Sequence, residues 1–288
     1  MKLRKATRQK AKIRLGLSAV SGGGKTYSAL LIAYGLCNDW SKIAVIDTEN
    51  NSADLYSHLG EYNVLPLKPP FSPESYIQSI KECEGEGMEV IIIDSISHEW
   101  EGEGGIMNLV DTIGGGFSDA WKKLTPRHEQ FKQSIIQSGC HIISTVRRKQ
   151  EYLLEEYVNK QGRTVQKPVK AGMKEITREG WEYELTMNLE LDIKHKASAS
   201  KDRTGLFIDK DPFTPTIATG QIIAKWCEEG IEVIDEVQDA IKKLAFCDSS
   251  DDLTMLKESL DKSTIVDPAF KTAALARFNQ LTKNLKTA

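Results

Sequence analysis

Four apolar runs mark the first half of the chain, at residues 12–18, 42–47, 89–94 and 140–146. An apolar run without strict alternation is typical of a strand that is buried on both faces of a parallel sheet. Each run is separated from the next by a segment that is long enough to cross back over the sheet as a helix. The pattern therefore predicts an α/β fold with a mostly parallel sheet.

The segments between these runs carry signals for helices. Residues 26–37 are predicted to form an apolar helix directly after the first run. Ser72-Pro73 and Thr125-Pro126 each have the form of an N-cap residue followed by proline at the first helical position. We expect the first of these helices to continue to about Glu84, and the second to end at Gly139.

The pattern changes after the fourth run. Residues 147–178 show no clear period, which predicts a loop. Residues 181–195 alternate like a strand, and residues 204–209 can pair with them through a polar turn at residues 198–202. A helix around residues 220–229 is expected to close this part of the chain.

The ends of the chain differ from its middle. Residues 1–14 contain seven Lys or Arg and no acidic residue, so they form either an arm that touches phosphates or a solvated tail. From about Glu232 the sequence predicts two or three helices. We therefore expect a basic N-terminal arm at residues 1–12, a core domain at 13–230 and a C-terminal helical region at 231–288.

Composition limits the possible partners. The 288 residues carry a net charge of -3, so only local basic clusters argue for nucleic acid. No apolar run follows the basic N-terminus, and the longest apolar stretches are as short as strands, so we expect neither a signal peptide nor a membrane span. Five cysteines without a CxxC pair are typical of reduced thiols. These features predict a cytoplasmic protein.

Residues 19–26, AVSGGGKT, join the first predicted strand to the first predicted helix. The segment ends like a phosphate-binding loop, although Ala19 stands where the pattern G-x-x-x-x-G-K-[ST] has its first glycine. We expect this alanine to be tolerated, because the first glycine serves the geometry of the chain more than it serves phosphate contact. Consecutive glycines let backbone N–H groups approach phosphate oxygens, and the N-terminus of the following helix favours an anion. The loop predicts a nucleotide-binding set of Ser21, Gly22, Gly23, Gly24, Lys25, Thr26 and Tyr27.

Other residues can complete a site for ATP and Mg²⁺. Lys25 is expected to reach the β- and γ-phosphates, and the Thr26 hydroxyl is expected to bind Mg²⁺. Asp94 ends the third apolar run, where its carboxylate can hold the same Mg²⁺ through water. Thr145, near the end of the fourth run, either senses the γ-phosphate or simply ends a strand. We include Thr145 and Asp94 in the nucleotide-binding set.

Hydrolysis also needs a group that orients or deprotonates the attacking water. Glu49 follows the second run by two residues, and the carboxyl ends of parallel strands meet at one edge of a sheet. Glu49 is therefore our preferred catalytic base, together with Lys25 as a catalytic cation. Glu99 and Glu101 are the alternatives, and Asp47 is expected to lie behind Glu49.

The order of these motifs, SGGGKT, VIDTEN, IIIDSIS and IISTVRRK, resembles the core of RecA-type recombinase ATPases. The resemblance covers about residues 13–230. It implies a RecA-like three-layer P-loop core, with ATP bound between the subunits of a ring or filament. It also implies that Glu49 is the catalytic base. The chain departs from the family at Ala19 and at Thr145, where recombinases usually carry glutamine.

More narrowly, the chain is similar to short RecA-like ATPases of bacteriophages, which are often grouped with the AAA-family ATPases. SKDRTGLF, residues 200–207, carries this likeness most clearly. In RecA-type proteins a cationic pair near this place reaches into the ATP site of the neighbouring subunit. By resemblance Lys201 and Arg203 take this role at the tip of the predicted hairpin, and a solvated tip is the alternative. A phage origin would place the protein in the bacterial host cytoplasm.

A local basic patch follows the fourth run. Six Lys or Arg and one acid, Glu175, lie in residues 160–178. By resemblance, the DNA-binding loops are residues 101–116 and 147–178, and such loops suit single-stranded DNA. A solvated surface loop is the alternative. The predicted nucleic-acid contacts are Arg147, Arg148, Lys149, Lys167, Lys170 and Lys174.

The leading hypothesis is a DNA-stimulated, oligomeric ATPase that binds DNA in recombination, replication or repair. A small-molecule or nucleoside kinase is the second hypothesis, because the same loop serves phosphoryl transfer. A nucleotide-binding module that does not hydrolyse ATP is the third.

Overall fold

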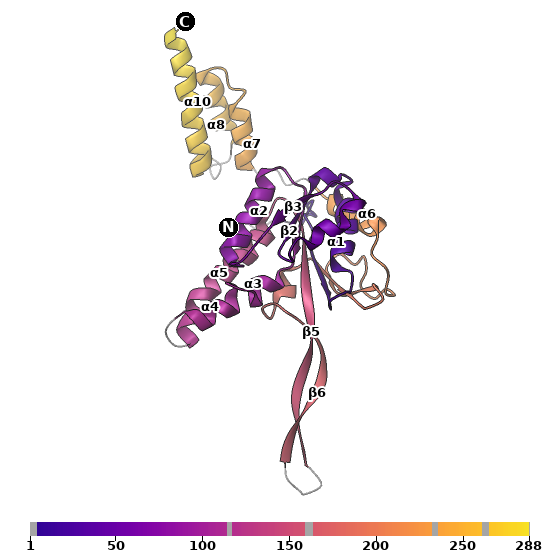
Figure 1. Ribbon diagram of the computed structural model, residues 1–288. Coiled ribbons are helices and arrows are strands. Elements are labelled where there is room, and N and C mark those ends of the chain that lie inside the picture. Colours follow the sequence, from indigo (N-terminus) through magenta and orange to yellow (C-terminus); the bar gives the residue numbers. More distant parts are fainter. Residues whose placement is uncertain (1–4, 114–116, 159–163, 232–235, 261–264, 288) are drawn as a thin grey trace. The chain divides into compact units, whose positions relative to one another are not determined.

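The computed structural model describes residues 5–113, 117–158, 164–231, 236–260 and 265–287 (Figure 1). The chain divides into two compact units, each of which is described by itself below. One unit comprises residues 11–229, and the other comprises residues 1–10 together with residues 230–288.

An eight-stranded sheet forms the centre of the larger unit, in the order β3-β2-β4-β5-β1-β7-β8, with β6 paired to β5 outside this series. All neighbours in the series are parallel except β8, which is antiparallel to β7. The strands are β1 (Arg14–Ala19), β2 (Ile43–Asp47), β3 (Asn63–Pro66), β4 (Val90–Asp94), β5 (His141–Val158), β6 (Thr164–Glu175), β7 (Met187–Leu191) and β8 (Ala197–Asp202).

Helices cover both faces of this sheet. One face packs against α1 and α6, and the other packs against α2 and α5 (Figure 1). β4 serves both cores, because Val90 and Ile92 point to the first and Ile91 and Ile93 point to the second. The helices are α1 (Lys25–Cys37), α2 (Pro73–Gly85), α3 (Ser97–Glu101), α4 (Ile106–Thr112), α5 (Phe117–Gln137) and α6 (Ile217–Glu228), with 3₁₀ helices η1 (Trp40–Lys42), η2 (Ser52–Leu59) and η3 (Trp181–Glu184). The predicted three-layer α/β fold is confirmed.

The two predicted proline starts have different outcomes. Ser72 caps α2 as expected, because its hydroxyl accepts the N–H of Ser75. The second prediction is wrong, since Pro126 lies inside α5, which begins at Phe117. Leu124, two residues before Pro126, is fully buried. Packing of the turns before Pro126 outweighs the one backbone hydrogen bond that proline cannot donate.

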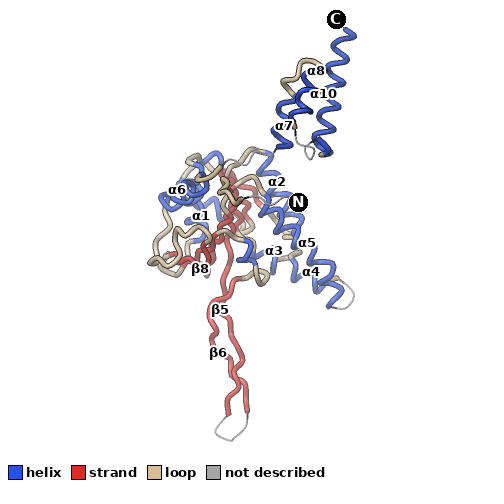
Figure 2. The backbone as a smooth tube through the Cα atoms, turned by 180° about the vertical axis from the view of Figure 1, so that it is seen from behind, coloured by secondary structure: helices blue, strands red, loops and turns tan. Residues whose placement is uncertain are grey.

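The predicted loop at residues 147–178 is also wrong, because β5 continues far beyond the apolar run and pairs with β6 in a long antiparallel ribbon. Figure 2 shows this ribbon extending away from the rest of the sheet. Leu153 and Leu154 on it are 56% and 64% exposed. Since neither face of the ribbon covers a core, its sequence lacks the alternation that identifies a half-buried strand.

The hairpin after the ribbon is displaced from its predicted position. Its turn is at residues 192–196, where the Asp192 carboxylate accepts two backbone N–H groups. The predicted turn at residues 198–202 falls instead in β8. Residues 204–209 form no strand, because the Asp202 carboxylate binds three of their backbone N–H groups.

The smaller unit contains α7 (Glu236–Leu244), α8 (Ser250–Ser259) and α10 (Pro268–Thr287), in the part of the chain where the sequence predicts two or three helices. These helices share a small core that includes Leu244, Leu253 and Phe270. Residues 5–10 belong to the same unit, and the Lys10 N–H donates to the Ile231 carbonyl at 3.0 Å. Among the described residues, no helix has the length and apolarity required to cross a membrane.

Candidate active site

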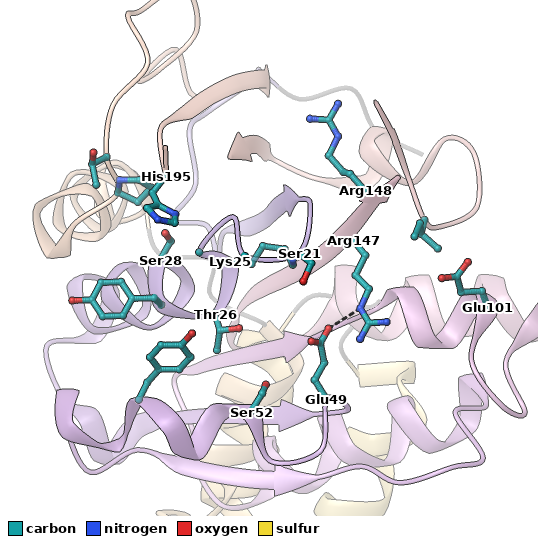
Figure 3. Close-up of a pocket in the computed structure, with 17 residues that line it drawn as sticks. Ser21, Lys25, Thr26, Ser28, Glu49, Ser52, Glu101, Arg147, Arg148 and His195 are labelled. Atoms are coloured by element: carbon teal, nitrogen blue, oxygen red, sulfur yellow. Dashed lines mark hydrogen bonds and ion pairs between the residues drawn. The ribbon is translucent and has the colours of Figure 1, made fainter. Parts of the chain in front are cut away.

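A cavity of about 870 Å³ opens where β1, β2 and β5 reach the edge of the parallel sheet (Figure 3). Its wall combines the loop after β1, the segment after β2, the base of the ribbon, the β7–β8 turn and the segment before α6. Ligand sites in proteins commonly enclose about 300–1,000 Å³. The cavity is therefore large enough for a nucleotide.

The local geometry requires glycine at each of three positions in the loop after β1, for a different reason at each. Gly22 and Gly24 have φ values of 77° and 82°, in the left-handed region that side chains disfavour. A Cβ atom on Gly23 would lie only 2.6 Å from the Cβ of Ala19. Gly24 also caps α1 without any side-chain hydrogen bond, which leaves the first N–H groups of the helix without a side-chain acceptor.

Lys25 lies along the inside of this loop and lines the cavity (Figure 3). Its ammonium donates to the carbonyls of Ala19 and Val20 at 3.4 and 3.3 Å. Burial lowers the pKa of Lys25, whereas the charges of Asp94 and Glu49 oppose this shift. The loop thus holds a cation beside its own backbone N–H groups, as a phosphate site requires.

Asp94 lies at the end of β4 and is 1% exposed. Thr26 Oγ1 donates to Asp94 Oδ2 and Thr145 Oγ1 donates to Oδ1, both at 2.5 Å. Burial raises the pKa of Asp94, and the two hydroxyl hydrogen bonds act against this shift. The structure thus brings together the two expected Mg²⁺ ligands. It places Thr145, expected at the γ-phosphate, behind Asp94 and fully buried.

Glu49 lines the cavity opposite the loop, two residues after β2 (Figure 3). Asp47 fixes this segment, because its carboxylate accepts the N–H groups of Glu49 and Ala53. Glu49 Oε1 accepts a hydrogen bond from Arg147 Nε at 2.9 Å. Burial alone would raise the pKa of Glu49, but the Arg147 hydrogen bond, with the charges of Arg147 and Lys25, brings it below its ordinary value. Glu49 is therefore held as a carboxylate.

The structure distinguishes Glu49 from the two alternative candidates for the catalytic base. Glu99 is 1% exposed and pairs with His128 Nδ1 at 3.0 Å, so it has no access to the cavity. Glu101 lines the cavity, and its Oε2 lies 3.7 Å from Lys149 Nζ. Of the three carboxylates, Glu49 alone follows β2 and faces the loop that holds Lys25.

Several residues of the cavity wall were missed by the sequence analysis. His195 lies in the β7–β8 turn, and a Cβ atom on Gly24 would come within 2.9 Å of its Nδ1. Tyr56 was also missed, and its ring meets edge to face that of Tyr27, which was predicted, with centroids 5.8 Å apart. Tyr56 belongs to η2, directly after the segment that carries Glu49, and this proximity was the available signal. No such signal pointed to His195, because the sequence predicted the turn at residues 198–202.

Contrary to the prediction, Lys201 and Arg203 do not lie at the tip of the hairpin, because its turn is at residues 192–196. Lys201 is opposite Asn188 in the sheet, toward the amino ends of the parallel strands and away from the loop after β1. Lys201 Nζ donates to the Glu182 carbonyl at 2.5 Å, and Arg203 donates to the Tyr183 carbonyl at 2.8 Å. Neither cation is among the described residues that line the cavity. They therefore do not complete the site of their own chain.

Ion pairs neutralise much of the predicted basic patch. Besides the pair of Arg147 with Glu49, Arg148 Nη1 lies 2.7 Å from Glu190 Oε2. Lys149 pairs with Glu101, and Lys174 lies 3.3 Å from Glu151. Lys170 is exposed on β6. The side chain of Lys167, together with Lys160 and Arg163, lies outside the described residues.

Residues 11–209 match a protein family described as an AAA domain. No curated protein matches the chain. One similar solved structure is described as a "Structural and biochemical analysis of a prototypical ATPase from the type III secretion system of pathogenic bacteria". It is 12% identical, with a TM-score of 0.36, over 97% of this chain and 87% of that chain.

The family match spans more than half of the 288 residues and contains the loop after β1, Glu49 and Asp94. The mostly parallel sheet, and the loop between β1 and α1, agree with the P-loop core that the sequence predicts. The chain therefore belongs to the family described as an AAA domain.

Proposed function

We propose that the protein binds ATP with Mg²⁺ in the cavity and hydrolyses it with Glu49 as the general base. One observation carries the proposal: Lys25, Thr26, Asp94 and Glu49 come together where β1, β2 and β4 end. Lys25, Thr26 and Glu49 line the cavity, and Asp94 contacts Thr26 from behind it, so the arrangement supplies a cation, two oxygen ligands for a metal and a carboxylate.

The loop after β1 fits a triphosphate. The positive φ values at Gly22 and Gly24 leave the backbone N–H groups without side chains above them, and Lys25 adds a positive charge. The N-terminus of α1 lacks a side-chain cap, which suits an anion. Tyr27 and Tyr56 offer aromatic surface at the same cavity for a nucleoside.

The metal site has the donors that Mg²⁺ prefers. The Thr26 hydroxyl and the Asp94 carboxylate already contact each other, so both would bind with little rearrangement. When bound, Mg²⁺ neutralises charge on the phosphates. Glu49 would then hold the attacking water and accept its proton, which requires the carboxylate to leave Arg147.

We further propose single-stranded DNA as the partner, in recombination, replication or repair. The ribbon supports this, because it projects from the edge of the cavity and carries Lys149, Lys170 and Lys174. Pairing of Lys149 and Lys174 with acids means that DNA has to displace those acids. Steep salt dependence of the DNA effect is therefore expected.

A homo-oligomer, as a ring or filament, is part of the same proposal. Lys201 and Arg203 lie at the edge of the sheet away from their own loop, so they are available to the site of a neighbouring subunit. Hydrolysis would then require assembly.

The test is phosphate release from ATP with purified full-length protein, with and without single-stranded DNA, over a series of salt concentrations. We expect Mg²⁺-dependent hydrolysis that DNA stimulates and salt suppresses. Glu49→Gln should abolish hydrolysis while ATP binding remains. Phosphoryl transfer only in the presence of an added acceptor would favour a kinase. ATP binding without turnover, even with DNA, would favour a non-hydrolysing module.

A further inference from the structure

The β7–β8 turn brings His195 against the loop after β1 of the same chain. The imidazole ring packs on Gly24, because a Cβ atom at that position would lie 2.9 Å from His195 Nδ1. A Cβ atom on Gly23 would likewise come within 3.7 Å of the Asp192 carbonyl oxygen. The turn and the loop are therefore in contact, and His195 forms part of the cavity wall.

Hydrogen bonds inside the turn fix the backbone that carries this ring. Asp192 Oδ1 accepts the N–H groups of Lys194 and Lys196, both at 2.8 Å. The His195 N–H donates to the Asp192 carbonyl at 3.0 Å. His195 itself has a φ value of 60°, in the left-handed region that most side chains disfavour. The position of the imidazole is thus set before any ligand arrives.

The ring nitrogens of His195 are available to a ligand. In the part of the chain that the structure describes, neither of them has a hydrogen-bond partner, and the side chain is exposed. The carboxylate of Asp192 is already used by the backbone of the turn. The turn does not need an imidazole at this position, since glycine suits the left-handed conformation better. An unused donor on the wall of a cavity of nucleotide size indicates contact with a ligand.

The place of His195 on the wall selects one part of the nucleotide. In the view of Figure 3, Lys25 lies between His195 and Glu49, which is the proposed base for attack on the γ-phosphate. The backbone of such a loop holds the α- and β-phosphates, and its lysine reaches the β- and γ-phosphates. A ring that rests on Gly24 is therefore beside the α- and β-phosphates and away from the γ-phosphate.

We propose that His195 is a nucleotide ligand, which donates a hydrogen bond from the β7–β8 turn to the α- or β-phosphate bound by the same chain. An imidazole carries a ring N–H in either protonation state, so the donor is always present. The inference rests on the proposed ATP site and adds to it a contact from outside the sequence motifs. Because ADP has the same two phosphates, the contact strengthens binding of ATP and ADP alike.

The test is titration of the full-length protein with fluorescent analogues of ATP and ADP in the presence of Mg²⁺. His195→Gly should weaken both by about tenfold, because a hydrogen bond to a charged group contributes at about this level. Glycine at φ 60° preserves the turn. If His195→Gly shows no cooperative melting transition, His195→Ala replaces it, since alanine adds no backbone strain that histidine lacks. Unchanged or tighter binding of ADP would overturn the inference.

Lys194→Ala is the matched control. It removes an exposed cation from the same turn, and Lys194 is not among the described residues that line the cavity. Both affinities should stay unchanged in this variant. Equal losses in Lys194→Ala and His195→Gly would show a general effect of the turn and would overturn the specific contact.

Pyrophosphate separates a phosphate contact from a nucleoside contact, because it has no base or sugar. It is used to displace the fluorescent ADP analogue from the wild type and from His195→Gly. The variant should lose pyrophosphate affinity by about the same factor as ADP affinity. Unchanged pyrophosphate affinity beside weakened ADP binding would place His195 at the nucleoside and overturn the inference.

Failure of the proposed function has a different result. Wild-type protein that binds neither ATP nor ADP would remove the ATP site itself. Binding that depends on Lys25 but not on His195 would overturn this inference alone. In hydrolysis, His195→Gly should raise KM by about tenfold without loss of kcat, whereas a fall in kcat alone would contradict a contact made equally in the ground state.

Discussion

At the scale of single residues, the loop after β1 depends on a contact between Ala19 and Gly23. A Cβ atom on Gly23 would lie 2.6 Å from that of Ala19, which no side chain tolerates without a shift of the loop. We therefore expect Gly23→Ala to weaken ATP binding, because overpacking of this kind costs about 1–3 kcal/mol. Ala19→Gly should change ATP affinity little. Titration with a fluorescent ATP analogue measures both effects.

The double variant separates this contact from a general demand for glycine. Ala19→Gly combined with Gly23→Ala should recover much of the lost affinity, since the clashing methyl group is gone. Lys25→Ala is the reference for complete loss of hydrolysis. Equal damage from Ala19→Gly and Lys25→Ala would contradict the view that this alanine is a tolerated change.

His141 gives the fold a specific sensitivity to acid. It is 5% exposed, and its Nδ1 accepts the N–H of Ile13 at 3.1 Å, so it is buried in the neutral form. Burial lowers its pKa from 6.5 to about 3, with the charges of Lys12 and Arg14 in support. The unfolded chain therefore binds the proton first, and stability present above pH 6.5 is lost as the pH falls toward 3.

The expected slope for this one proton is at most about 1.4 kcal/mol per pH unit. Urea unfolding between pH 7 and pH 4 measures it. His141→Asn keeps an acceptor for Ile13 but does not titrate, so its stability should fall less steeply over this range. Parallel pH profiles for the two proteins would show that His141 is not the group responsible.

At the scale of elements, the ribbon is the part whose structure is least supported by the core. Two strands alone are marginally stable in water, and Leu153 and Leu154 remain mostly exposed. Tyr152 pairs with Lys170, so residues 153–169 can be replaced by a two-residue Asn-Gly turn. We expect this variant to keep its melting temperature within about 5 °C and to lose stimulation by single-stranded DNA. Retained stimulation would place the DNA elsewhere, such as residues 101–113.

The ribbon also shows where the sequence stops being informative. Strands buried on both faces, such as β2 and β4, have continuous apolar runs, and their positions were predicted closely. The ribbon, with neither face on a core, has no such pattern. The short strand β3 was missed as well, because half of its residues are exposed at the edge of the sheet.

The candidate site likewise contains some residues that the sequence predicts and others that it does not. The loop after β1, Glu49 and Asp94 could be predicted because each lies at the end of a buried strand or follows one at a fixed spacing. His195 and the Arg147–Glu49 contact could not, since they depend on how the β7–β8 turn and the ribbon cross the carboxyl edge of the sheet. Contacts between elements that are distant in sequence leave no local pattern.

At the scale of the whole molecule, one chain holds a nearly complete site and two cations that it does not use there. Lys201 and Arg203 bind carbonyls of η3 at the far edge of the sheet. An identical neighbour in a head-to-tail assembly can receive these cations, because such an interface joins two different surfaces of the same chain. A cation supplied in this way is worth roughly 10³–10⁵ in rate in other P-loop enzymes.

Complementation between two inactive variants tests this arrangement. One chain carries Glu49→Gln and retains Lys201 and Arg203, and the other carries Lys201→Ala with Arg203→Ala and retains Glu49. In an equal random mixture, about one quarter of the interfaces join an intact base to an intact cation pair. We expect the mixture to hydrolyse ATP, although neither variant does so alone. A mixture of Glu49→Gln with Lys25→Ala should stay inactive, because both changes damage the same half of the interface. Absence of activity in the first mixture, with assembly intact by light scattering, would confine both cations to a structural role at η3.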